Sequence, residues 1–287
     1  MAVSGNHNII LEGPPGAGKT MLAKCIPSIM PDMSFREALE TTKIHSVAGK
    51  MKDTEGIVYR RPFMSPHHTA SRVSIIGGGQ SAKPGVVSLA HNGVLFLDEM
   101  LESLRQPLED RVITVTRVKA NLEYPASFML AGSMNPCPCG YYGSKDRECT
   151  CSPTQIKKYR ERISGPLLDR MDIRINVDNV KYDELTDKTE AESSAEVRKR
   201  VNRTRALQRE RFKDDGISSN AEMSEKHLNK YCVLSRECEE ILKYAFESLK
   251  MSARARSRII KVARTIADMD LSENIEPKHL LEAISYR

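Results

Sequence analysis

The sequence is organised around one glycine-rich stretch, Gly13-Pro14-Pro15-Gly16-Ala17-Gly18-Lys19-Thr20. An apolar run, Asn8 to Leu11, precedes it, and a helix-like run, Met21 to Ile26, follows it. In this order the glycines let backbone N–H groups turn inward, and the helix N-terminus adds partial positive charge. Lys19 would reach the β- and γ-phosphates, and Thr20 would face Mg²⁺. A glycine turn carrying Lys-Thr by chance is the alternative, but the full pattern predicts that all eight residues bind a nucleotide.

An acidic pair, Asp98-Glu99, follows the apolar run Val94 to Leu97. Four apolar residues predict a short buried strand, and open α/β sheets bind ligands at the carboxyl ends of their strands. Asp98 would hold Mg²⁺ directly or through water, and Glu99 would polarise the attacking water as a general base. The pair alone could be a strand end without a role. In the same chain as the phosphate loop it predicts an ATPase site.

Two β-like runs follow, Gln106 to Arg117 and Leu122 to Ala131. With Lys119-Ala120-Asn121 as the turn, they predict a hairpin over about 111–127 with basic residues near its tip. The second run leads to Asn135, which could contact the γ-phosphate or position the lytic water. Asn135 could also be a simple turn residue before a proline.

Four of the seven cysteines form two C-x-C pairs within 137–151: Cys137, Cys139, Cys149 and Cys151. Four thiolates can complete a tetrahedral zinc site, so we expect structural Zn²⁺, with free or oxidisable thiols as the alternative. Cys25, Cys232 and Cys238 lie in apolar helical patterns and are expected to be small core residues.

Composition excludes some classes of function. The 287 residues are 40% hydrophobic and 29% charged, which is ordinary for a globular protein. No apolar stretch approaches the roughly 20 residues that span a bilayer, and Met1 to His7 lacks the features of a signal peptide. We therefore expect a cytoplasmic protein without membrane contact. A net charge of +6 favours polyanionic partners weakly, and the absence of Trp argues against base stacking as a main binding mode.

The patterns predict an α/β fold with a parallel sheet flanked by helices over 1–180, followed by a helical lid domain over 181–287. A last strand is expected at Ile173 to Val177 and a linker at Lys181 to Ser194. The segment of about 44–92 has poor periodicity and is expected to be a functional insertion; its paired histidines, His67 and His68, are expected to have ordinary structural roles. The later helices are expected at Ser194–Phe212, Ser224–Tyr231, Ser235–Leu249, Ala253–Met269 and Pro277–Tyr286.

Nearly the whole chain resembles the magnesium-chelatase-like AAA+ ATPases, specifically the ComM/YifB family. The resemblance rests on the phosphate loop and on long motifs: T-T-K-I-H-S-V-A-G at Thr41, S-P-H-H-T at Ser65, S-L-A-H-N-G-V-L-F-L-D-E at Ser88, L-R-Q-P-L-E-D at Leu104, S-M-N-P-C-P-C-G-Y-Y-G at Ser133, S-G-P-L-L-D-R-M-D-I at Ser164 and S-A-R-A at Ser252.

The resemblance implies roles that composition cannot assign. Asn135 matches the sensor-1 residue, Arg254 the sensor-2 arginine of the lid, and Arg170 the arginine finger that reaches the neighbouring subunit's ATP, with Arg162 in reserve. Arg170 also lies between carboxylates, so a salt bridge is its alternative role. Segment 44–92 matches the helix-2 insertion and 111–127 the pre-sensor-1 hairpin. A homo-oligomer, as a hexameric ring, is implied.

The sequence departs from the family in two places. Members usually carry a Lon-protease-like domain before the phosphate loop, so we expect the sequence to be either an excised ATPase module or a short relative. Members also have more residues after the acidic pair than Met100 to Ser103; we expect either a break near Met100 or a deletion that affects Glu99.

The expected function is a Mg-dependent ATPase motor that remodels or branch-migrates DNA, a possible helicase. The alternative is a magnesium-chelatase-type motor subunit acting on a protein or tetrapyrrole partner. A third class, an inactive nucleotide-dependent scaffold, fits the complete set of ATPase residues poorly.

Overall fold

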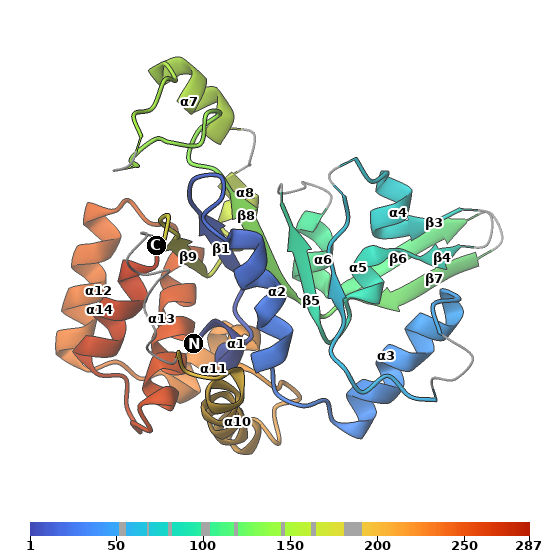
Figure 1. The fold of residues 1–287 in the computed structure, drawn as a ribbon. Coiled ribbons are helices and arrows are strands. Elements are labelled where there is room, and N and C mark those ends of the chain that lie inside the picture. Colours follow the sequence, from blue (N-terminus) through green and yellow to red (C-terminus); the bar gives the residue numbers. More distant parts are fainter. Residues whose placement is uncertain are drawn as a thin grey trace.

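The computed structural model describes residues 1–51, 56–67, 69–79, 82–98, 104–117, 120–144, 147–161, 165–180 and 191–287. The chain forms an α/β domain around a five-stranded parallel sheet, with a helical domain packed beside it (Figure 1). This confirms the expected fold class. His68, Glu99, Met100, Lys119 and Arg162 lie outside the described residues, so the expectations placed on them stay predictions.

The strand order of the central sheet decides which loops meet. The order is β2-β5-β8-β1-β9, and every neighbouring pair is parallel. β8 therefore separates β1, which leads into the phosphate loop, from β5, which leads into Asp98. The bounds are β1 (Ile9–Glu12), β2 (Phe63–Met64), β5 (Val94–Leu97), β8 (Met129–Met134) and β9 (Ile173–Asn176).

Both faces of the sheet are buried, because successive side chains of a strand point to opposite faces. In β5, Val94 and Phe96 enter one hydrophobic cluster, and Leu95 and Leu97 enter the other. A sheet covered on both sides needs apolar residues at every position of its strands, and the continuous apolar runs that predicted these strands supply them.

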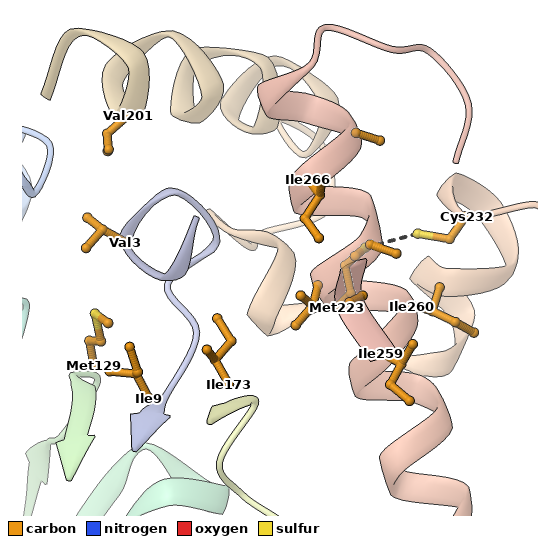
Figure 2. Packing of buried hydrophobic residues seen from close by; sticks show 14 of the residues in the cluster. Val3, Ile9, Met129, Ile173, Val201, Met223, Cys232, Ile259, Ile260 and Ile266 are labelled. Carbon is orange, nitrogen blue, oxygen red and sulfur yellow. Dashed lines mark hydrogen bonds between the residues drawn. The ribbon is translucent and has the colours of Figure 1, made fainter. Parts of the chain in front are cut away.

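The first face is covered by two N-terminal helices and by the helical domain. Val3, Ile9 and Met129 lie on the same side as Val201 and Ile266 in one continuous cluster (Figure 2). The helical domain therefore shares a core with the sheet. Its five long helices agree with the expected ranges within one or two residues. The helices of this face are α1 (Ala2–Gly5), α2 (Lys19–Ile29), α10 (Ser194–Arg211), α11 (Glu225–Tyr231), α12 (Arg236–Ser248), α13 (Ala253–Met269) and α14 (Pro277–Ser285), with the 3₁₀ turn η2 (Asn220–Glu222).

The second face is covered by short elements (Figure 1). These are α4 (Arg72–Ile76), α5 (Val86–Leu89), α6 (Arg105–Asp110), the hairpin of β3 (Gly77–Gly78) with β4 (Lys83–Pro84), and the hairpin of β6 (Val112–Arg117) with β7 (Ala120–Pro125). The hairpin predicted over 111–127 is present. Its turn was misplaced, since Ala120 and Asn121 pair within the ladder.

Three local predictions need correction. Segment 44–92 is not only an insertion, because Phe63–Met64 pairs with β5 as the edge strand. Helix α3 (Phe35–Val47) was not predicted, although Ser34 and Glu37 form a capping box at its start. Cys25 is exposed rather than buried, because its side chain lies on the outer side of α2. The remaining helices are α7 (Pro153–Arg160) and α8 (Gly165–Leu168).

A buried polar network joins the two domains at the amino ends of β1 and β9. His7 Nε2 lies 2.8 Å from Thr265 Oγ1 of α13. Asp172 accepts from the Asn8 N–H at 3.0 Å and pairs with Arg258 at 3.2 Å. Burial alone would raise the pKa of Asp172, but His7 and Arg258 outweigh it and hold that pKa below its ordinary value. These contacts fix α13 relative to the sheet.

Among the described residues, no helix has both the length and the apolar character needed to cross a membrane.

Candidate functional site

The phosphate loop connects β1 to α2 at the carboxyl edge of the sheet. Gly16 and Gly18 have φ of 86° and 81°, a backbone conformation in which a side chain would be strained. Lys19 is buried, and its Nζ donates to the carbonyls of Gly13 at 2.7 Å and Pro14 at 2.8 Å. The loop therefore holds the ammonium group of Lys19 against its own carbonyls.

The ends of the neighbouring strands complete this site. Asn135 follows β8, and its Oδ1 accepts from Lys19 Nζ at 3.1 Å. Asp98 follows β5 and accepts a short hydrogen bond from the Ser133 hydroxyl. Burial lowers the pKa of Lys19, and the nearby Asp98 carboxylate opposes that shift. Lys19 and Asp98 both line the same pocket.

These residues line one pocket of about 600 Å³. Its lining combines residues of the phosphate loop, a lysine, the hydroxyl-bearing Thr20, Ser133 and Tyr159, and a carboxylate. This donor set suits a polyphosphate with Mg²⁺, which prefers oxygen ligands and keeps some of its waters. Thr20 and Asp98 would hold the cation. The lining residues are Pro15, Gly16, Ala17, Gly18, Lys19, Thr20, Met21, Asp98, Ser133, Met134, Asn135 and Tyr159.

The four clustered cysteines come together directly after Asn135. Cys137 Sγ lies 3.3 Å from Cys139 Sγ and 3.6 Å from Cys149 Sγ, and the four ligand atoms lie within 4.8 Å of one another. Four thiolates at about 2.3 Å from a tetrahedral zinc ion would be about 3.8 Å apart. The Tyr142 N–H also donates to Cys137 Sγ at 3.3 Å. The arrangement fits Zn²⁺ with no open ligand position.

The cysteine loop packs against the phosphate loop. A Cβ atom added at Gly140 would lie 2.4 Å from Pro15 Cδ. At the far end of α7, Arg160 lies 3.7 Å from Glu12, the last residue of β1. The cysteine loop therefore packs against the phosphate loop, α7 is ion-paired to the end of β1, and Tyr159 of α7 lines the pocket.

This contact gives a prediction with a matched control. Gly140→Ala should weaken ATP binding by roughly tenfold, because the new methyl group must displace Pro15 or the cysteine loop. Gly143→Ala is the control: Gly143 also has a positive φ, of 79°, but a Cβ there meets nothing within 4 Å. Titration with a fluorescent ATP analogue measures both. An equal loss of ATP affinity in the two variants would attribute the effect to backbone strain and contradict a role for the contact between Gly140 and Pro15.

Neither Arg170, expected to serve a neighbouring subunit, nor Arg254, expected to come from the lid, lines this pocket. Arg170 is buried and lies in a separate cavity of about 310 Å³ with Asn8, Phe128 and Asp172, which precede β1, β8 and β9. This is the amino edge of the sheet, opposite the phosphate loop. Arg254, at the start of α13, lies 4.0 Å from Glu109, and Arg170 is ion-paired with the same carboxylate.

The helical domain does not border this pocket. No residue of 191–287 lines the nucleotide pocket in the part of the chain that the structure describes. The helical domain packs on the α2 face of the sheet through the shared core instead. Arg254 is consequently held away from the phosphate loop of its own chain.

Comparison with known families agrees with this architecture. A family model described as "Magnesium chelatase, subunit ChlI" matches residues 1–185, and one described as "Magnesium chelatase, subunit ChlI C-terminal" matches residues 191–287. The chain belongs to the magnesium chelatase family of AAA+ proteins. The two matches divide it close to the boundary expected at residue 180.

Individual relatives of this AAA+ chain align over its whole length. It is 42% identical to the uncharacterized protein YifB of Salmonella typhimurium and 41% identical to the competence protein ComM of Haemophilus influenzae, covering 57% of each. A Mycobacterium bovis relative is 38% identical, with 58% of its length covered. The chain thus spans less than two thirds of these relatives.

The sequence patterns did not predict the roles of two residues in this magnesium chelatase family fold. Tyr159 of α7 lines the nucleotide pocket, and Glu109 of α6 joins the two arginines. Glu109 lies inside the family motif L-R-Q-P-L-E-D, but the motif does not predict its contacts with Arg170 and Arg254. No local signal distinguishes Tyr159 from the neighbouring polar residues of its helix.

Proposed function

We propose that this AAA+ protein is a Mg-dependent ATPase that works as a homo-oligomeric ring. The observation that carries the proposal is that no described arginine lines the phosphate pocket. Hydrolysis of ATP builds negative charge on the transferred phosphoryl group, and arginines stabilise it. The pocket of one chain is therefore incomplete without a second copy.

The placement of the arginines supports a head-to-tail assembly. Arg170 lies at the amino edge of the sheet and the phosphate loop at its carboxyl edge, with the four residues of β1 between them, about 13 Å of strand. One chain cannot bring both ends to one phosphate. A neighbour that presents its amino edge can do so, and repetition of such a contact closes a ring. Six subunits is the proposed number.

Within each site the residues would divide the work. Lys19 and the loop N–H groups would bind the β- and γ-phosphates, and Thr20 and Asp98 would hold Mg²⁺. Asn135, which already contacts Lys19, would orient the γ-phosphate or the lytic water. Glu99 would be the general base. Arg170 and Arg254 would both come from the neighbour, because Glu109 keeps them on one edge.

DNA is the proposed substrate of the motor. The chain carries a net charge of +6 and a pI near 8.9, which favours a polyanion. One relative is called a competence protein. The β6–β7 hairpin, whose first strand ends at Arg117, would contact the phosphate backbone, so binding should weaken steeply with salt.

Steady-state ATP hydrolysis with and without forked DNA tests the proposal. The wild-type protein should turn over faster with DNA. Arg170→Ala should lose at least 99% of that rate, while Arg236→Ala, a change of an arginine with a 94% exposed side chain, should keep it. An absence of ATP turnover under assembling conditions would contradict the proposed ATPase activity. An ATP turnover rate that does not change with DNA would contradict DNA as the substrate.

A magnesium-chelatase-type subunit is the second candidate, favoured by the description of the matching family. In that case the motor would act on a protein or tetrapyrrole partner. Reconstitution with the partner subunits of a chelatase separates the two: magnesium insertion without DNA stimulation would establish the second candidate and remove the first.

We also propose that the cysteine cluster holds one structural Zn²⁺. Elemental analysis should find about one zinc per chain, and Cys137→Ser should lose it and lower the melting temperature, because metal binding contributes directly to the stability of its loop. Cys25→Ser, a change of an exposed cysteine outside the cluster, should retain the metal. Protein that neither contains zinc nor takes it up after reduction would contradict the site.

A further inference from the structure

We propose that Glu109 is a positioning residue that holds Arg170 and Arg254 together as one unit for the neighbouring subunit's ATP. The inference rests on the proposed ring, and goes beyond it by naming the residue through which both arginines act. Three separate elements meet at this carboxylate: α6, the turn after α8, and the first turn of α13.

The contacts are asymmetric in burial. The Arg170 side chain is 5% exposed and that of Arg254 is 64% exposed, with Glu109 intermediate at 52%. Both guanidinium groups approach the same Glu109 oxygen, Oε1, through Nη2. The Glu109 carboxylate thus lies next to both arginines and links the buried Arg170 to the exposed Arg254.

This arrangement solves an electrostatic problem. Two guanidinium groups that serve one phosphate must lie close together before the phosphate arrives, although they repel each other. A carboxylate between them offsets the repulsion and fixes their directions. A buried charge such as that of Arg170 also requires a charged or hydrogen-bonded partner. Glu109 meets both requirements, and an incoming phosphate would compete with it for the arginines.

Glu109 also stands where the hairpin joins the domain. Arg111, two residues later, pairs with Glu222 of the helical domain at 3.2 Å. Its carbonyl accepts from the Ala126 N–H at 2.8 Å, which closes the base of the hairpin. A displacement of the β6–β7 hairpin would therefore move α6 and Glu109 with it. Binding of substrate to the hairpin would therefore change the positions of the two arginines through Glu109.

The first test measures kcat and KM of Glu109→Gln under assembling conditions. We expect kcat to fall at least tenfold while KM for ATP stays within twofold, because the variant's own phosphate loop is unchanged. Asp110→Asn, a change of the next residue on α6, which is also exposed, should match the wild type. A raised KM with normal kcat would assign Glu109 to its own subunit's pocket and overturn the inference.

The second test mixes two impaired proteins, Glu109→Gln and Lys19→Ala. Glu109→Gln subunits keep an intact pocket, and Lys19→Ala subunits keep intact arginines. Mixed rings should exceed the average of the two separate rates, since each Lys19→Ala subunit can supply ordered arginines to a Glu109→Gln neighbour. A mixture at or below that average would overturn the inference.

Two controls separate the possible failures. A wild-type protein without turnover would contradict the proposed ATPase itself. Normal turnover in Glu109→Gln beside loss in Arg170→Ala would contradict only the role of Glu109. If Glu109→Gln melts below the wild type, Glu109→Asp replaces it: the shorter side chain keeps the charge that Arg170 needs but cannot reach both arginines, so kcat should still fall.

Discussion

Lys19→Ala is expected to reduce ATP hydrolysis to below about 1% of the wild-type rate and to weaken nucleotide binding at least tenfold. Lys19 Nζ is the charged donor at the centre of the phosphate loop, bonded to two loop carbonyls and to Asn135. Loss of one preorganised donor to a developing charge typically costs 10²–10³ in rate. Alanine also removes the only described lysine that lines the pocket.

Phosphate release and binding of a fluorescent ATP analogue measure this effect. Lys24→Ala is the matched control, because Lys24 lies on the same helix but its side chain is exposed. It should bind and hydrolyse ATP as the wild type does. Equal activity in both variants would show that the pocket is not the nucleotide site.

Asp268→Ala should destabilise the protein by about 3–5 kcal/mol. Asp268 is 1% exposed, and its carboxylate pairs with Arg211 and with Arg264 Nε at 3.0 Å, while Asn220 Nδ2 donates to it at 2.8 Å. Burial alone would lower the pKa of Arg211, but its bond to Asp268 raises that pKa overall. Without the carboxylate two arginines keep buried, uncompensated charge, and removal of one partner from such a network has this cost.

Urea denaturation gives the free energy of unfolding directly. Glu210→Ala is the control: the Glu210 side chain is 76% exposed and pairs with Lys213 at 2.8 Å, so its loss should cost less than about 1 kcal/mol. Similar values for the two variants would mean that the buried network adds no more than a surface pair.

Local patterns predicted most of the fold. The apolar runs before Gly13 and Asp98 became buried strands on either side of β8, because only a sheet covered on both faces accommodates such runs. The helices from Ser194 onward begin within one residue of their expected starts. The structure gives the reason, since Ser193, Ser235 and Ser252 accept from the N–H group three residues later and fix where three of these helices start. Edge strand β2 was not predicted, because a strand of two residues is too short to show the alternation of apolar and polar residues.

What the sequence determined by itself was the phosphate loop, the two C-x-C pairs of cysteines and the strand ends that carry Asp98 and Asn135. Their chemistry depends on residue types at short spacings, which a linear pattern contains. What only the tertiary structure decided was the position of the helical domain, and with it the grouping of Arg170 and Arg254 at Glu109. Those residues are 61 to 145 positions apart, from Glu109 to Arg170 and to Arg254. Their meeting follows from how a shared hydrophobic core seats α13 against the sheet, and no local pattern encodes a contact of that range.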